Sequence, residues 1–147
     1  MSEAVRCAIV VARFYEDLAE RLVASARERL SEGGVDEVDV FDVPGAYELP
    51  LAARYAAQTG RYAGVVCLGA VIRGETDHYE YVCAEAARGI QHVGLETGVP
   101  CSFGVLTVDT YEQAEARAGG EKRDQGRDSA EAVLAMAALR ERLERGG

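Results

Sequence analysis

Residues 69–82 read GAVIRGETDHYEYV, and they follow the apolar run AGVVCL at residues 63–68. The run has the length and composition of a buried parallel strand. Residues 79–95 then show the apolar spacing of a helix. The stretch therefore predicts a strand, a glycine-bounded loop and a helix start. In an open α/β sheet, the carboxyl edge of the strands is where ligands bind.

Strand-like and helix-like segments alternate along the whole chain. Apolar runs predict further strands at 6–12, 35–43 and 100–108, and helical spacing predicts further helices at 15–32, 47–59, 110–117 and from 126 onward. Acidic residues alternate with apolar ones over 35–43, which is typical of an edge strand. This pattern predicts an α/β fold, a three-layer α/β/α sandwich around a four-stranded parallel sheet. With 147 residues, we expect residues 1–147 to form a single domain.

Composition excludes several classes of function. The net charge of −9 argues against nucleic acid or an anionic membrane as partner, because phosphate backbones require clustered Lys and Arg. The first residues lack a basic leader and the first apolar run is short, so we expect neither a signal peptide nor a membrane span. The four cysteines, none in a Cys-x-x-Cys pair, are expected to be buried free thiols of a reducing, cytoplasmic protein. They are Cys7, Cys67, Cys83 and Cys101.

The loop within residues 69–82 carries chemistry of its own. Asp77 and Glu80 have the spacing of a capping box, so the helix should begin near His78. The N–H groups of residues 74–76 would then be unpaired and directed outward, which makes an anion site at the helix start. At the rim of that site, the helix dipole disfavours the His78 cation and leaves an imidazole able to give and take a proton. The alternative is an ordinary capped helix with a surface histidine in its first turn.

Parallel strands bring their carboxyl ends together, and two further side chains are expected at this edge. Phe14 follows the first strand and could stack on a planar ring, although it could equally be a core aromatic. Glu48 follows the second strand and could accept hydrogen bonds from hydroxyls, or simply complement the dipole of the next helix. Together with the anion site, they suit a planar heterocycle with a polyhydroxylated arm and a small phosphate.

The last helix is expected to be apolar almost all the way round over residues 130–139. A terminal helix in a small domain covers the sheet with only one face, so the other face would need a neighbouring subunit. The alternative is that alanine is abundant there because it is a good helix former.

Several stretches in order resemble the lumazine synthase family. They are ARF at 12–14, VPGAYELP at 43–50, the loop at 69–82, FGVLT at 103–107, EQA at 112–114 and RAG at 117–119. The resemblance implies a flavodoxin-like fold and the penultimate step of riboflavin biosynthesis. In that step, 5-amino-6-(D-ribitylamino)uracil and 3,4-dihydroxy-2-butanone 4-phosphate give 6,7-dimethyl-8-ribityllumazine, phosphate and water. It implies a transferase that uses no cofactor and no metal.

The resemblance also implies roles for particular residues. His78 would be the catalytic proton-transfer group, and Phe14 would stack on the pyrimidine. The remaining substrate-binding residues would be Ala46, Tyr47, Glu48, Ala70, Val71, Ile72, Glu75 and Thr76, with Phe103 and Arg117 supplied by a neighbouring subunit. The site would lie between subunits of a homo-oligomer, which is a pentamer in some family members and an icosahedral shell of pentamers in others.

One position departs from the family pattern. Family members usually carry Asn-Lys-Gly before the last helix, with the lysine near the phosphate, and this chain has Asp124-Gln125-Gly126 instead. Lys122, Arg123 or Arg127 could supply the missing charge, or Arg117 could suffice. Two alternative functions remain open: a riboflavin synthase of the related archaeal type, and an inactive flavin-binding or shell-forming protein of the same fold.

Overall fold

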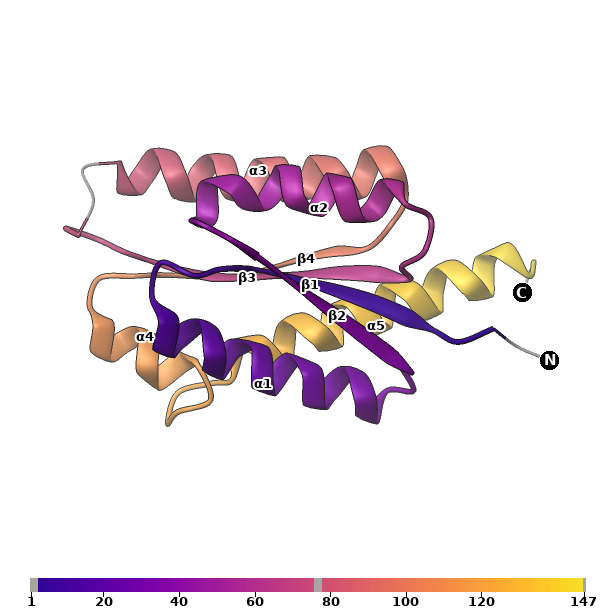
Figure 1. Ribbon diagram of the computed structural model, residues 1–147, viewed down its shortest axis with the longest axis horizontal. Helices are drawn as coiled ribbons and strands as arrows, with labels where there is room; N and C mark the ends of the chain where they lie inside the picture. The colour runs from indigo at the N-terminus through magenta and orange to yellow at the C-terminus, as the bar shows by residue number, and fades with distance from the viewer. Residues whose placement is uncertain (1–2, 76–77, 147) are drawn as a thin grey trace.

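The computed structural model describes residues 3–75 and 78–146, and in this part of the chain strands and helices alternate as predicted (Figure 1). The strands form one parallel sheet in the order β2-β1-β3-β4. The strands are β1 (Arg6–Ala12), β2 (Glu37–Val43), β3 (Gly64–Ile72) and β4 (Cys101–Val108). The helices are α1 (Glu16–Glu32), α2 (Leu49–Gln58), α3 (Tyr79–Thr97), α4 (Tyr111–Arg117) and α5 (Gln125–Glu144), with a 3₁₀ turn, η1 (Ala46–Glu48), before α2.

Helices cover both faces of the sheet, which confirms the three-layer, flavodoxin-like expectation. Helices α2 and α3 lie over one face, and α1, α4 and α5 lie over the other (Figure 1). Each face has its own apolar core, built around Ile9 and Leu68 on the α1 side and around Val10 and Cys67 on the α2 side. Successive strand residues point to opposite faces, so β1 and β3 are apolar on both sides and must be central.

Local sequence explains most of the element boundaries. The helix expected at 47–59 begins instead as η1 and becomes α-helical at Leu49, with Pro50 in the first turn, where its missing N–H costs nothing. Helix α4 starts as predicted with a capping box: Thr110 Oγ1 accepts from the Gln113 N–H at 3.1 Å, and Gln113 Oε1 accepts from the Thr110 N–H. Helix α5 begins at Gln125, and the Asp124 carboxylate accepts from the Arg127 N–H.

Strand β2 is an edge strand, as the alternating acidic pattern indicated. Its carboxylates have partners within the chain. Glu37 pairs with Arg6, and Asp42 accepts from Arg13 Nε at 2.7 Å. Asp39 accepts from the Tyr62 hydroxyl at 2.8 Å. The three carboxylates therefore mark an edge that is charged but internally compensated.

At Gly126, α5 lies directly against the backbone of α1. A Cβ added at this buried position would overlap the Leu22 carbonyl oxygen and lie 3.1 Å from Leu22 Cα. These are backbone atoms of α1, so they cannot turn aside as a flexible side chain would. The absence of a side chain at Gly126 therefore sets how closely α5 approaches α1.

The cysteines are free thiols, as expected, but only two are buried. Cys7 and Cys67 lie in the core, whereas Cys83 and Cys101 are half-buried, so the expectation that all four are buried is wrong. Burial raises the pKa of Cys7 to about 11 and that of Cys101 to about 11, which keeps both thiols protonated near neutral pH. Within residues 3–75 and 78–146, no helix combines the length and apolar character that crossing a bilayer requires.

Candidate active site at the carboxyl edge

The chain leaves β1, β3 and β4 at the same end of the sheet (Figure 1). Phe14 follows β1 with 70% of its surface exposed, which excludes the core-aromatic alternative. The turn at residues 73–75 follows β3, and His78 stands just before α3. The fold therefore gathers the expected aromatic ring, loop and histidine at one edge.

The turn after β3 differs from the expected anion cradle. The Glu75 N–H donates to the Ile72 carbonyl at 3.3 Å, so the expectation that this amide is unpaired is wrong. Gly74 has a φ of +87°, a backbone conformation that residues other than glycine rarely adopt. This conformation lets the turn close on itself. The expectations for Thr76 and Asp77, the capping box included, fall outside the described residues.

Side chains tie this turn to the strands on both of its flanks. On the β4 side, Arg73 Nε donates to Asp109 Oδ1 at 2.9 Å, and the guanidinium lies over the Tyr79 ring at 4.4 Å. On the β1 side, the Tyr15 hydroxyl donates to Glu75 Oε1 at 2.7 Å. Side-chain contacts therefore hold the turn on both of its flanks.

Tyr15 is a residue that the sequence reasoning missed. Its ring packs edge-to-face on Phe14, with centroids 4.9 Å apart and planes at 83°, and it contacts Tyr111 at 6.2 Å. Burial, and then the Glu75 carboxylate, raise the pKa of the Tyr15 hydroxyl well above its usual range. The only signal in the sequence was a second aromatic residue directly after Phe14.

His78 lies on the surface, immediately before the first residue of α3. Its carbonyl accepts from the Val82 N–H at 2.9 Å, and its ring is tilted against Tyr81 with centroids 6.5 Å apart. The imidazole is therefore not turned into the core. Its position at the start of the helix is the one that the loop sequence predicted.

The segment after β2 places its three expected residues in different environments. Ala46 is buried and Tyr47 is 60% exposed. Glu48 Oε1 accepts from the Gly45 N–H at 2.9 Å, and Glu48 also lines a hollow of about 490 Å³ between β2 and α2. The same hollow is lined by Phe41 and Tyr55. Glu48 is thus both a local cap and a carboxylate at an open cavity.

The end of β3 extends beyond its neighbour β1. Pairing with β1 ends at Leu68, whereas pairing with β4 continues to Ile72. In the described sheet, Ala70 and Val71 are therefore paired with β4 alone, and their other edge faces the space beyond β1. This is the arrangement expected of residues that offer backbone groups to a ligand.

Phe103 is not brought to this edge within one chain. It is 36% exposed and is the third residue of β4, where its register partner is Cys67. Because β4 reaches the carboxyl edge only at Val108, Phe103 lies away from that edge in a single copy. Arg117 ends α4, and its Nη1 donates to the Gln113 carbonyl of the same helix at 3.1 Å.

Gln125 stands where family members usually carry a lysine. Gln125 Nε2 donates to the Phe103 carbonyl at 3.5 Å. Arg127 is engaged on α1, where its Nη2 donates to Glu32 Oε1 at 2.7 Å and Glu28 lies nearby. This contact lowers the pKa of Glu32. Arg127 is therefore already used for helix packing, while Lys122 and Arg123 are exposed in the loop before α5.

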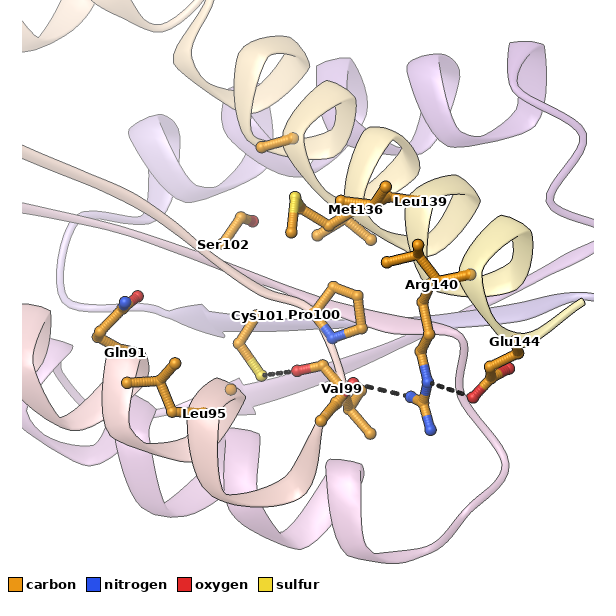
Figure 2. A pocket seen from close by; sticks show the side chains of 15 residues that line it. Gln91, Leu95, Val99, Pro100, Cys101, Ser102, Met136, Leu139, Arg140 and Glu144 are labelled. Carbon is orange, nitrogen blue, oxygen red and sulfur yellow. Dashed lines mark hydrogen bonds and ion pairs between the residues drawn. The ribbon is translucent and has the colours of Figure 1, made fainter. Parts of the chain in front are cut away.

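A second hollow, of about 630 Å³, lies at the opposite end of the sheet between the end of α3, the start of β4 and α5 (Figure 2). Its wall is apolar and includes Leu95, Met136 and Leu139, which remain 75%, 52% and 42% exposed. At its rim, Arg140 Nη1 donates to the Gly98 carbonyl at 2.8 Å. The outer face of α5 is thus apolar and uncovered in one chain, whereas none of the expected site residues lines this hollow.

Neither a cluster of metal ligands nor His92 adds to the site in the part of the chain that the structure describes. No group of three or more His, Cys, Asp or Glu side chains in residues 3–75 and 78–146 is placed to hold a metal ion. His92 lies on α3, and its Nε2 is 3.2 Å from Glu96 Oε2, away from the carboxyl edge.

Comparison with known proteins identifies close relatives along nearly the full chain. The sequence model of the family described as 6,7-dimethyl-8-ribityllumazine synthase matches residues 4–141. Similar proteins of that name occur in Salinibacter ruber, with 49% identity over 95% of this chain and 90% of the relative, and in Coxiella burnetii, with 49% identity over 95% and 93%. The relative in Desulfatibacillum aliphaticivorans is 45% identical over 97% of this chain and 94% of its own.

Proposed function

The chain belongs to the 6,7-dimethyl-8-ribityllumazine synthase family, a transferase of riboflavin biosynthesis, and we propose that the carboxyl edge of its sheet is the active site for that reaction. The observation that carries the assignment is the shared location of exposed Phe14, exposed His78 and the turn at residues 73–75. An aromatic platform, a group for proton transfer and a polar turn are what this condensation requires.

The reaction needs repeated proton movement. The amine of 5-amino-6-(D-ribitylamino)uracil adds to the ketone of 3,4-dihydroxy-2-butanone 4-phosphate and gives an imine with loss of water. Phosphate is then eliminated, and closure of the second ring releases another water. Each step takes a proton from one nitrogen, carbon or oxygen atom and delivers one to another, so an imidazole beside the reacting atoms serves as both acid and base. His78 has this role in the proposal.

The pyrimidine and its ribityl arm bind on the β1 and β2 side. Phe14 offers an exposed ring face for stacking. Residues Ala70, Val71 and Ile72 offer backbone groups along the edge of β3 that β1 leaves free. The ribityl arm extends toward η1, where Ala46, Tyr47 and Glu48 hold it. Glu48 lines the hollow between β2 and α2, and its carboxylate accepts hydrogen bonds from hydroxyls.

The phosphate end binds beyond β3, at Glu75 and Thr76. The Glu75 side chain is directed to Tyr15, whose hydroxyl donates to its carboxylate at 2.7 Å. A guanidinium then supplies the positive charge, because its planar fork matches two phosphate oxygens. Arg117 of a neighbouring copy has this role in the proposal.

The active form in this proposal is a homo-oligomer of the cytoplasm, a pentamer or a shell of pentamers. Two features of the single chain support an oligomer. Phe103 lies near the start of β4, away from the carboxyl edge, which supports its supply by a second copy. The outer face of α5 leaves Met136, Leu139 and Leu143 exposed, which is unusual for a surface that stays in water.

Replacing Arg117 with alanine is expected to raise KM for the phosphate substrate about tenfold or more, because a charge-assisted contact to phosphate is lost. The KM for the pyrimidine should change little, since Arg117 does not touch that substrate in the proposal. Steady-state kinetics with each substrate varied in turn measure both values. Arg88→Ala, which removes a surface guanidinium paired with Glu85 at 2.9 Å, is the control. An unaltered KM for the phosphate substrate would remove Arg117 from the site.

The assignment as a whole is tested by mixing both substrates with the purified protein. Lumazine absorbance and released phosphate should appear together and well above the rate in buffer. Riboflavin formed from lumazine alone would instead indicate the archaeal-type riboflavin synthase. A yellow flavin that co-purifies without turnover would indicate the inactive, flavin-binding alternative.

A further inference from the structure

The turn at residues 73–75 is fixed to β4 on one side and to the end of β1 on the other. On the β4 side, the Arg73 N–H donates to the Val108 carbonyl at 2.8 Å and the Arg73 side chain reaches Asp109. On the β1 side, the contact is the hydrogen bond from Tyr15 to Glu75. We propose that Tyr15 is a positioning residue for the active site assigned above, holding the phosphate-side turn in register with the Phe14 ring.

Tyr15 is suited to this role because its ring is itself held. The ring is half-buried between Phe14, which packs on it at 83°, and Tyr111 at the start of α4. Aromatic edge-to-face pairs fix ring orientation as well as burying apolar area. One side chain therefore contacts the proposed pyrimidine platform through its ring and the phosphate-side turn through its hydroxyl.

The hydroxyl acts as a donor under all ordinary conditions. Burial and the neighbouring Glu75 carboxylate both raise the Tyr15 pKa, so the phenol keeps its proton. The hydrogen bond therefore joins a neutral donor, the phenol, to a charged acceptor, the carboxylate. Such a bond is stronger than one between two neutral groups. Tyr15 touches no reacting atom in the proposal, so it acts only through Phe14 and Glu75.

This arrangement predicts an effect on one substrate more than on the other. Tyr15→Phe keeps the ring against Phe14 and removes only the oxygen that reaches Glu75. We expect KM for the phosphate substrate to rise about three- to tenfold. The turnover number should stay within about twofold, because Tyr15 acts on Glu75 and Phe14, whereas His78 is positioned as the residue that precedes α3. The KM for the pyrimidine should be nearly unchanged.

Tyr62→Phe is the matched control. The Tyr62 hydroxyl makes the same kind of bond, to Asp39 Oδ2 at 2.8 Å, but Tyr62 precedes β3, at the opposite end of that strand from the turn at residues 73–75. Because Tyr62 lines the hollow that Glu48 also lines, it is a control for the phosphate-substrate KM alone. A loss of general stability would affect both tyrosine variants. A loss of stability would not explain a rise in the phosphate-substrate KM that occurs in Tyr15→Phe alone.

A double-mutant cycle with Glu75→Ala isolates the pair itself. If the bond carries the effect, the double variant should have nearly the same phosphate-substrate KM as Glu75→Ala alone. Two results would overturn the positioning role and leave the proposed function intact. One is a double variant in which the KM increases of the two single variants multiply. The other is an unchanged KM in Tyr15→Phe while the wild type is active. A wild type without lumazine synthesis would overturn both. Should Tyr15→Phe fail to fold, the comparison of Glu75→Gln with Glu75→Ala decides the matter. Glutamine keeps an oxygen that can accept from the Tyr15 hydroxyl, so its KM should stay near that of the wild type while alanine raises it, and equal KM values would overturn the positioning role.

Discussion

His78→Ala should lower kcat for lumazine formation by about a hundredfold or more, the usual contribution of a positioned acid–base group. The imidazole lies on the surface at the start of α3, and imidazole is the side chain best suited to give and take protons near neutral pH. The KM values should change far less than kcat, because stacking on Phe14 and contacts to the phosphate do not involve His78. Stopped-flow or steady-state absorbance of the lumazine product measures the rate.

His92→Ala is the natural control for this experiment. His92 is the other histidine of the chain, lies on the same helix and is paired with Glu96 far from the carboxyl edge. It should retain the wild-type rate. Equal kcat values for the wild type and His78→Ala would show that proton transfer uses another group or water.

Gly126→Ala should be strongly destabilising, by about 3 kcal/mol, because the new methyl group meets the α1 backbone at Leu22. Neither helix can relieve the overlap by a rotamer change, so α5 must move away from α1 and from the sheet. For a chain of this length, this loss corresponds to a melting temperature lower by about 6–12 °C. Thermal unfolding followed by circular dichroism measures the shift at fixed protein concentration.

Gly94→Ala is a control that makes the same substitution but should change the free energy of unfolding in the opposite direction. Gly94 lies within α3, where an added Cβ would meet its nearest neighbour, the Val99 carbonyl oxygen, at 3.6 Å, an ordinary contact. Alanine is a better helix former than glycine, so the variant should gain up to about 1 kcal/mol. A Gly126→Ala variant that melts with the wild type would show that α1 and α5 do not pack as closely as described.

Much of the fold could be predicted because the local signals agree with the tertiary structure. The apolar run at 63–68 marks a central strand, the acidic alternation at 35–43 marks an edge strand, and the Thr110 box marks the start of α4. Where an element boundary differs from the prediction, contacts with another part of the chain are the reason. Strand β2, expected to start at residue 35, starts at Glu37, because the Val35 N–H donates to the Leu30 carbonyl at the end of α1.

The site was less predictable, because its geometry depends on contacts between distant segments. The sequence indicated Phe14 and His78 through their places after a strand and before a helix. It gave no sign that Glu75 would close a turn on Ile72 or receive a hydrogen bond from Tyr15, sixty residues away. The supply of Phe103 by a neighbouring subunit was indicated by the resemblance to the family and not by the residue pattern, because the place of Phe103 relative to the carboxyl edge depends on strand register.

The compensated carboxylates of β2 have a consequence for newly made chains. An open strand edge invites a second copy to add its own strand, which is a common beginning of aggregation. A second copy laid along β2 would meet a strand lined by charged side chains that already have partners within the chain, and charged side chains on an edge strand disfavour such pairing. The fold therefore discourages amyloid-like stacking along this border while its apolar surfaces elsewhere stay available for ordered contacts.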